Sequence, residues 1–224
     1  QLANTIFKIV DPELDFSCQH VDGLTVKNGD SIFKVTGRIQ SILKSERLVL
    51  NCMQRMSGIA STTRKYVDAV KGTSAKVMDT RKTTPLLRSL EKQAVVTGGG
   101  HNHRFGLFDM ILIKDNHVDS AGGIKAALEK AKKYLEKNNL QLPIEIETRT
   151  LAEVEEALSA GTANRIMFDN FTPLLVKEGV NLVNKKTETE ASGGITLQNI
   201  RDYALTGVDC ISVGALTHSV KSLD

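Results

Sequence analysis

The chain has 224 residues, of which 41% are hydrophobic and 25% are charged, a globular composition that excludes a disordered or low-complexity chain. Its 29 basic and 26 acidic residues leave a net charge of +3, which is too small an excess to indicate a nucleic-acid-binding surface. No apolar run approaches the roughly 20 residues that span a bilayer, so we expect no membrane partner. The length is typical of one large domain, alone or with a small appendage.

The cysteine content indicates a reducing compartment. The sequence holds three cysteines, Cys18, Cys52 and Cys210, and no CxxC pair. They are too few for a disulfide framework, and their spacing is not that of a structural zinc site. We expect a cytoplasmic protein with Cys52 and Cys210 in its core.

The first 40 residues predict mixed structure. Residues 1–9 are typical of the end of a helix, and the proline-containing segment 11–15 indicates a turn. The sequence Asn28-Gly29-Asp30 separates two β-rich runs, which predicts a hairpin over residues 25–35.

From Ser41 the pattern becomes helical. Residues 45–53 carry an apolar stripe at helical spacing. A second helix is predicted over residues 59–70, because Gly72 follows it as a stop signal.

From residue 74 short apolar runs each end in polar residues, and amphipathic segments at 123–137, 151–160 and 197–205 lie between them. The last three runs are spaced by about 20–23 residues, the length of a short βα unit in a parallel barrel. The pattern therefore predicts an α/β fold with an incomplete, open barrel of six strands instead of eight. The predicted strands are 75–79, 110–114, 144–147, 165–169, 187–192 and 210–214.

In such barrels the functional site lies at the carboxyl ends of the strands. We expect these ends to meet at one mouth that holds several cations, two separated carboxylates and two glycine-rich turns. The alternative is that each strand end is an independent, solvated loop. The strand-end residues are Asp79-Thr80-Arg81-Lys82, Lys114-Asp115-Asn116, Glu147, Asp169-Asn170, Ser192-Gly193-Gly194 and Gly214.

Five basic residues lie on or near the first two strand ends: Arg81, Lys82, His103, Arg104 and Lys114. Like charges concentrated in one place repel unless an anion neutralises them, and arginine suits bidentate binding of carboxylate or phosphate. Surface salt bridges are the alternative, but the segment 80–104 contains a single acidic residue. The pattern favours a polyanionic ligand.

The later strand ends carry a different chemistry. Glycine loops such as Ser192-Gly193-Gly194 and Gly214-Ala215 often bind phosphate through backbone N–H groups in parallel barrels. Glu147 and Asp169 are candidates to stabilise a cationic transition state, hold a sugar hydroxyl or bind Mg²⁺ among phosphates. Their alternative role is a salt bridge to Lys82 or Lys114.

Three other patterns do not indicate the functions that they first suggest. Gly98-Gly99-Gly100 matches neither a dinucleotide-binding nor a Walker loop and indicates a turn. His101 and His103 lack a third metal ligand at a suitable spacing. The run 130–133 is typical of the solvated face of a helix.

Taken together, the chain resembles the quinolinate phosphoribosyltransferases, the nicotinate-nucleotide pyrophosphorylases of NAD synthesis. The matching stretches run in family order over nearly the whole chain. They are Glu46-Arg47, Leu50-Asn51, 54–60, 79–83, 98–104, 113–117, 145–147, 168–170, 192–195 and 213–218.

The resemblance implies a fold and a domain division. Residues 1–40 would form part of a small N-terminal α/β sandwich domain, and residues 41–224 a helical lead-in followed by an incomplete α/β barrel. The family has a further N-terminal segment and a short C-terminal continuation. We therefore expect the chain to be part of a longer protein, which leaves organelle targeting open.

The resemblance also implies a reaction. Quinolinate and phosphoribosyl pyrophosphate would give nicotinate mononucleotide, pyrophosphate and CO₂, with Mg²⁺ accompanying the pyrophosphoryl substrate and no organic cofactor. By this likeness, the quinolinate carboxylates are bound by Arg81, His103 and Arg104, and by Arg47 from a neighbouring subunit of a homodimer with a shared active site. The remaining implied site residues are Lys82 and Lys114 as catalytic lysines, Glu147 and Asp169 by the ribose and the metal, and Asn170, Ser192, Gly193, Gly214 and Ala215 at the phosphoribosyl group.

Two other functions remain open at this point. A related transferase acting on another acid, such as the pyrophosphorylase-like proteins found with molybdate transport systems, would share most of the motifs. A non-enzymatic anion-binding module would explain the cations, although Glu147 and Asp169 would weaken simple anion capture. Release of CO₂ from quinolinate distinguishes the transferases, and turnover after binding of phosphoribosyl pyrophosphate excludes the module.

Overall fold

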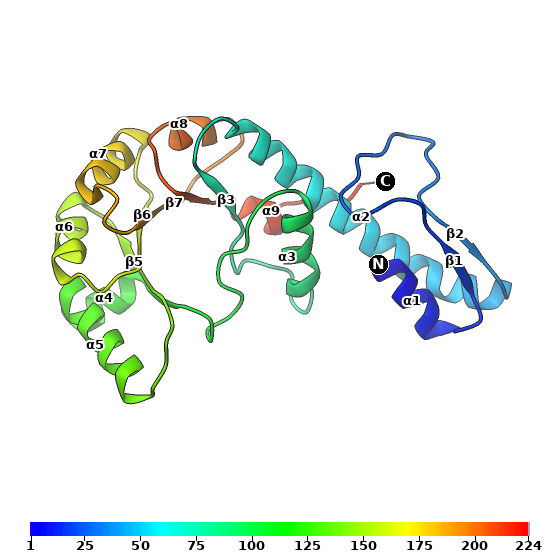
Figure 1. Cartoon of the computed structure of the whole chain (residues 1–224), viewed down its shortest axis with the longest axis horizontal. Helices are drawn as coiled ribbons and strands as arrows, with labels where there is room; N and C mark the ends of the chain where they lie inside the picture. The colour runs from blue at the N-terminus through cyan, green and yellow to red at the C-terminus, as the bar shows by residue number, and fades with distance from the viewer. Residues whose placement is uncertain (224) are drawn as a thin grey trace.

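The computed structural model describes residues 1–223 and consists of a small N-terminal unit joined by one long helix to an open barrel (Figure 1). The small unit contains α1 (Leu2–Val10) and the antiparallel strands β1 (Asp15–Ser17) and β2 (Lys34–Thr36). The long helix, α2, covers Ile39–Ala69. No helix among the described residues is long and apolar enough to cross a membrane.

The predicted hairpin over residues 25–35 is wrong. A turn does form there, because Asp30 donates its N–H to the carbonyl of Lys27 and accepts one from the Lys27 N–H, but the paired strands lie farther out, at β1 and β2. Phe16 and Phe33 stack at 5.1 Å between ring centroids, and both contact Phe7 of α1. Burial of these rings against α1 determines which residues pair as strands. The turn signal alone does not determine that pairing.

The two helices predicted after Ser41 are a single helix. Gly58 lies inside α2, and a Cβ at this position would come within 2.2 Å of the carbonyl oxygen of Lys221. The C-terminal segment runs back along the helix here, where Leu223 donates its N–H to the carbonyl of Gln54 at 3.0 Å. Gly58 therefore permits a close crossing and does not end the helix.

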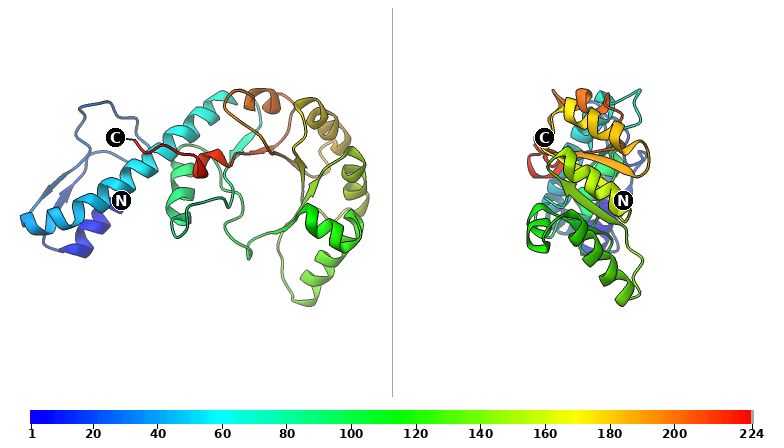
Figure 2. Two further views of the ribbon diagram at one scale, coloured as in Figure 1. Left: turned by 180° about the vertical axis from the view of Figure 1, so that it is seen from behind. Right: turned by 90° about the vertical axis from the view of Figure 1, so that its left-hand side faces the viewer.

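The barrel sheet has six parallel strands, the number that the sequence predicted, and their order is β3-β8-β7-β6-β5-β4. In the described residues β3 and β4 do not pair with each other, so the sheet stays open, and Figure 2 shows the strands on an arc with helices outside it. The strands are β3 (Lys76–Met78), β4 (Ile111–Ile113), β5 (Ile144–Thr148), β6 (Arg165–Asp169), β7 (Glu188–Ser192) and β8 (Cys210–Ser212).

The helices of the barrel were only partly predicted. The expected helices at 123–137 and 151–160 are present as α5 (Ile124–Lys137) and α6 (Leu151–Ala160), whereas the segment 197–205 is helical only in α8 (Ile200–Ala204). Four helices were not predicted: α3 (Arg88–Thr97), α4 (Asp115–Ala121), α7 (Pro173–Val183) and α9 (Ala215–His218).

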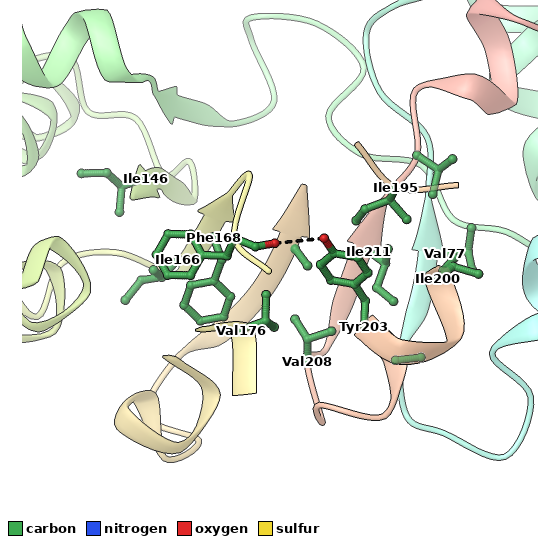
Figure 3. Packing of buried hydrophobic residues seen from close by; sticks show 14 of the residues in the cluster. Val77, Ile146, Ile166, Phe168, Val176, Ile195, Ile200, Tyr203, Val208 and Ile211 are labelled. Carbon is green, nitrogen blue, oxygen red and sulfur yellow. Dashed lines mark hydrogen bonds between the residues drawn. The ribbon is translucent and has the colours of Figure 1, made fainter. Parts of the chain in front are cut away.

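Alternate residues of the strands face two different environments. One set, including Ile146, Ile166, Phe168 and Ile211, packs with the helices in the main core, and Figure 3 shows this packing. The other set faces the barrel interior, and in β5 to β8 it is largely polar. It includes Glu145, Glu147, Arg165, Asp169, Glu190, Ser192 and Ser212.

The core prediction for the cysteines holds for Cys210, which is buried in β8, while Cys52 is half-buried on α2. All three cysteines are free thiols.

Candidate active site

The strand ends that carry charge do meet at one edge of the sheet. Lys114, which follows β4, donates to Glu147 of β5, with Nζ 2.6 Å from Oε1. Asp169 and Ser192 lie opposite each other where β6 and β7 pair. Four neighbouring strands therefore bring predicted site residues to the same rim.

The glycine turn after β7 packs tightly against the loop after β6. Gly193 has φ +97, and a Cβ there would come within 2.2 Å of Oδ1 of Asn170. Asn170 donates its side-chain amide to Asp169 at 2.8 Å and its backbone N–H to Ser192 at 2.8 Å. Only glycine fits at position 193, and the two loops form one rigid surface beside Asp169.

The turn after β8 meets the loop after β3. A Cβ on Gly214 would lie 2.9 Å from Nε2 of His218 and 3.5 Å from Cδ of Lys82. Thr217 of α9 donates its hydroxyl to the carbonyl of Lys82 at 2.8 Å. Lys82 is therefore placed beside Gly214 and the half-buried Ala215, although these residues are more than 130 positions apart in the chain.

The loop that carries Arg81 and Lys82 is held by ionic groups. Glu91, the single acidic residue between Thr80 and Arg104, is buried and accepts from the Thr84 N–H and from Nε of Arg55 at 2.8 Å. Arg88 donates to the carbonyl of Arg81 at 3.4 Å. Glu91 thus fixes the backbone of the loop through Thr84, and its own ionic partner is Arg55 instead of Arg81 or Lys82.

Arg104 lies against the charges of the mouth while remaining buried. It is 8% exposed and donates Nη1 to the carbonyl of Met110 at 3.2 Å. Burial, and then the positive charge of Arg81, lower the pKa of its guanidinium, while the charges of Glu145 and Glu147 oppose that effect. An anion bridging Arg81 and Arg104 would relieve their repulsion.

Asp79, at the first strand end, lies beneath the mouth. Its Oδ1 is 2.5 Å from Nζ of Lys92 and accepts the backbone N–H of His103 at 2.9 Å. Lys92 also donates to the carbonyl of His103 at 2.9 Å. Burial raises the pKa of Asp79 and lowers the pKa of Lys92. This pair, which the sequence did not indicate, fastens the segment before Arg104 to β3.

His103 is also buried, and its ring is turned into the barrel. Nδ1 accepts the backbone N–H of Arg104 at 2.7 Å. Nε2 lies 3.0 Å from Oε2 of Glu145 and 3.5 Å from Oε2 of Glu190. Burial lowers the pKa of the imidazole, which favours its neutral form.

Below His103 lies an ionic cluster that the sequence analysis missed. Nη1 of Arg165 is 2.9 Å from Glu190 and 3.6 Å from Glu145, and Ser212 donates its hydroxyl to Glu190. Burial raises the pKa of Glu145 to about 7, and burial together with the charge of Glu145 raises that of Glu190 to about 7. The sequence does contain a signal for this cluster. Charged residues recur at every second position in β5 and β7, so they lie on the same face of the sheet.

Arg47 is a predicted site residue that lies away from the mouth of its own chain. It lies exposed on α2, two residues before Val49, which packs in the small core with Phe7 and Leu14. That part of α2 belongs to the small unit at the far end of the molecule from the barrel (Figure 1).

Two protein-family models match the chain. The "Quinolinate phosphoribosyl transferase, N-terminal domain" matches residues 1–57, and the "C-terminal domain" of the same family matches residues 59–224. The two models meet inside α2.

Curated proteins and solved structures give the same result. "Quinolinate phosphoribosyltransferase [decarboxylating] 1b" of Nicotiana tabacum is 48% identical over 100% of this chain and 67% of its own length. "Probable nicotinate-nucleotide pyrophosphorylase [carboxylating]" of Bacillus subtilis is 46% identical over 97% of this chain and 74% of its own length. The crystal structure of NadC from Streptococcus pyogenes superposes with a TM-score of 0.94 at 40% identity, covering 100% of this chain and 78% of that one. Because the two family models cover nearly all of the chain and the relatives agree with it in sequence and fold, the chain belongs to the quinolinate phosphoribosyltransferase family.

Proposed function

We propose that the chain transfers the phosphoribosyl group of phosphoribosyl pyrophosphate to quinolinate, with release of pyrophosphate and CO₂, to form nicotinate mononucleotide in NAD synthesis. The observation that carries this proposal is the arrangement at the mouth, where Lys114 pairs with Glu147 and the charges of Arg81 and Glu147 both act on Arg104. The cations suit a dicarboxylate, and the carboxylate suits the positive charge that develops on the sugar.

We assign the two substrates to the two halves of the rim. Arg81, Arg104 and Lys114 lie on the β3–β4 side and would bind the quinolinate carboxylates, with Lys82 placed between the substrates. The turns after β6, β7 and β8 would bind the 5′-phosphate through short side chains and backbone N–H groups. These phosphate-binding residues are Asn170, Ser192, Gly193, Gly214 and Ala215.

The chemistry needs positioning and charge placement more than it needs a reactive side chain. The bond from the sugar C1 to pyrophosphate breaks as the pyridine nitrogen bonds to C1. Glu147 and Asp169 stabilise the cationic character of C1 in that step. The pyridinium then accepts the electron pair released when the adjacent carboxylate leaves as CO₂, and a proton takes its place on the ring carbon.

We further propose that Mg²⁺ enters with phosphoribosyl pyrophosphate as part of the substrate. Glu147 and Asp169 offer carboxylate oxygens, the donors that Mg²⁺ prefers. Lys114 already occupies Oε1 of Glu147, which supports an ion held mainly by phosphates.

A steady-state assay on the full-length protein tests the reaction. Quinolinate and phosphoribosyl pyrophosphate should yield nicotinate mononucleotide and CO₂ in equal amounts. Binding of phosphoribosyl pyrophosphate without CO₂ release would reject the proposal in favour of an anion-binding module. Turnover with a different pyridine acid alone would indicate a related transferase.

We propose a homodimer with a shared site, in which Arg47 of one subunit completes the mouth of the other. Its position on α2, remote from the mouth of its own chain, supports a role in trans. The variants Arg47→Ala and Lys114→Ala should each be inactive, and mixing them should restore about a quarter of the activity, because one site in four would then contain both native residues. Absence of any recovery after subunit exchange would reject the shared site.

We propose a cytoplasmic location on the basis of the free thiols, of which Cys18 is exposed. Several relatives have names that state another compartment, either mitochondrial or chloroplastic. Fractionation of cells that express the full-length protein distinguishes these locations.

A further inference from the structure

We infer that Arg88 is a positioning residue that fixes the spacing between Arg81 and Arg104, so that the mouth selects a substrate with two neighbouring carboxylates. The selectivity rests on the proposed function, since quinolinate is such a dicarboxylate. Arg88 does not bind the substrate in this role. It acts on the backbone of the two segments that carry the substrate-binding arginines.

The guanidinium of Arg88 joins these two segments. Nη2 donates to the carbonyl of Arg81 at 3.4 Å, and Nε donates to the hydroxyl of Thr83 at 3.1 Å. On the other side, Nη1 donates to the carbonyl of Phe105, the residue after Arg104, at 3.1 Å. One planar group with a rigid fork of donors therefore sets the separation of the two backbones.

Other contacts hold each segment internally. The Thr83 N–H donates to the carbonyl of Arg81 at 2.8 Å. The carboxylate of Asp109 accepts the N–H groups of Phe105 and Gly106. These bonds shape each segment without joining one to the other.

A second bridge between the same stretches of chain lies beneath the mouth. Lys92 donates to Asp79 and, at 2.9 Å, to the carbonyl of His103. Arg88 lies one turn before Lys92 on α3. This helix therefore fastens the two segments at two depths, and the arginines lie at the level that Arg88 holds.

The spacing needs such a brace because the two arginines repel each other. Arg104 is 8% exposed, and burial followed by the positive charge of Arg81 lowers the pKa of its guanidinium. Among the described residues, Nε of Arg104 has no hydrogen-bond partner, which leaves this donor for a ligand. Without a brace, repulsion would separate the arginines in the free enzyme, and a dicarboxylate would have to bring them together on binding.

The place of Arg88 on α3 favours this role over one in helix stability. Arg88 is the first residue of the helix, where the partial positive charge of the helix dipole disfavours a cation. Within the described part of the chain it forms no salt bridge, and its donors go to two carbonyls and a hydroxyl. Its contribution therefore lies in which segments it connects.

A third substrate-binding arginine is the competing role for this residue. Each nitrogen of its guanidinium already donates to the chain, so fewer donors remain for a ligand. A direct ligand would still contribute to binding after Arg81 is removed, whereas a brace would not. The two roles therefore differ in a double-mutant cycle.

Calorimetry on the full-length enzyme tests the positioning role without requiring turnover. Arg88→Lys keeps the positive charge but replaces the fork of donors with a single ammonium group. Its Kd for quinolinate should rise about 10-fold. The Kd values for phosphoribosyl pyrophosphate and for nicotinate, which has one carboxylate and is measured as a competitor, should stay within twofold. An unchanged quinolinate Kd, or an equal loss for quinolinate and nicotinate, would overturn the inference.

The double variant separates the brace from a direct ligand. Arg81→Ala removes one of the two groups whose spacing matters. Adding Arg88→Lys to it should therefore weaken quinolinate binding by less than a further twofold. A further tenfold loss would identify Arg88 as an independent ligand and would reject the positioning role.

Arg201→Lys is the matched control. Arg201 of α8 also braces backbone with a guanidinium, because Nη1 donates to the carbonyls of Ala69 and Lys71 at 3.3 and 2.6 Å, at the end of α2. This variant should leave all three Kd values unchanged. A rise in quinolinate Kd equal to that of Arg88→Lys would show that any loss of such a brace suffices, and would overturn the specific role of Arg88.

A crystal structure of the native full-length enzyme with quinolinate does not depend on the variants folding. Arg88 should keep its bonds to the carbonyls of Arg81 and Phe105, with Arg81 and Arg104 on different carboxylates of the ligand. Contact of Arg88 with a carboxylate, or release of either carbonyl, would overturn the inference. If quinolinate binds as expected but the native enzyme releases no CO₂, the proposed function fails and the positioning role stands. A native enzyme that bound no quinolinate would refute both.

Discussion

Lys114 and Glu147 form an ion pair across two neighbouring strand ends, with Nζ 2.6 Å from Oε1, and the two partners differ in exposure. The lysine side chain is 43% exposed, whereas the glutamate is 10% exposed. The pair therefore places a largely buried carboxylate at the rim of the barrel beside a more exposed cation, which can move toward an incoming anion.

Glu147→Gln should reduce kcat about 100-fold, because it removes the negative charge that opposes the developing oxocarbenium ion. The exposed Lys114 can return to water, so the melting temperature should change little. Steady-state kinetics and a thermal melt measure the two effects. Glu178→Gln, an exposed acid on α7, should leave kcat unchanged. A kcat within threefold of the native value would remove Glu147 from the chemistry.

Arg81→Ala should weaken quinolinate binding about 100-fold, equivalent to ~2.7 kcal/mol. In the free protein it should not lower the melting temperature, because it also removes a positive charge that repels Arg104. Thermal melts with and without quinolinate test both statements. Lys133→Ala, on the exposed face of α5, is the control and should keep the full ligand-induced shift. A normal shift in Arg81→Ala would contradict the assignment.

Gly193→Ala should impair the phosphoribosyl side of the site selectively. A Cβ at this position meets Asn170 at 2.2 Å, and the backbone there has φ +97, so the turn after β7 must shift. We expect the KM for phosphoribosyl pyrophosphate to rise at least 10-fold while quinolinate affinity, measured by calorimetry, stays within threefold. Equal losses for both ligands would indicate a general disturbance of the rim.

Lys92→Met should lower the free energy of unfolding by ~3–5 kcal/mol, because it leaves the buried Asp79 without a cation. Adding Asp79→Asn should recover part of this loss, since the uncompensated charge is then removed. Urea denaturation measures both variants. Arg38→Gln breaks the exposed pair with Glu13 and should change stability by no more than ~1 kcal/mol. A similarly small effect of Lys92→Met would show that the buried pair is not structural.

The buried carboxyl groups predict a pH dependence of stability. The pKa values of Glu145 and Glu190 rise from 4.5 to about 7 in the folded chain. Between these values the folded chain holds protons that the unfolded chain has released, so the free energy of unfolding should fall as the pH rises from about 4.5 to about 7. Glu190→Gln should flatten this slope in urea denaturation series. No change in slope would contradict the raised pKa.

Glu188→Gln should act with the opposite sign. Burial opposes the shift, but Arg165 lowers the pKa of Glu188, so its stabilising contribution is present above its ordinary pKa of 4.5 and is lost as the pH falls further. At neutral pH this variant should therefore have a lower free energy of unfolding than the native chain. The difference should become smaller as the pH falls below about 4.5.

The sequence alone determined the barrel and its six strands. Most strands are short runs that contain apolar residues and are followed by polar ones, and that pattern is local, so the strands and their carboxyl ends could be located without coordinates. The motifs from Arg81 to His218 indicated the family for the same reason, since each is a contiguous group of residues.

Only the tertiary structure decided which charges are exposed to a ligand and which are buried. Asp79 and Lys82 lie three residues apart at the same strand end, yet Asp79 is buried in contact with Lys92, whereas Lys82 is exposed. Likewise, residues 45–53 and 59–70 were predicted as two helices, whereas they form one helix that the C-terminal segment crosses at Gly58. In each case the deciding contact joins residues distant in the chain, and the free energy of burial depends on that contact and not on the residue's sequence neighbours.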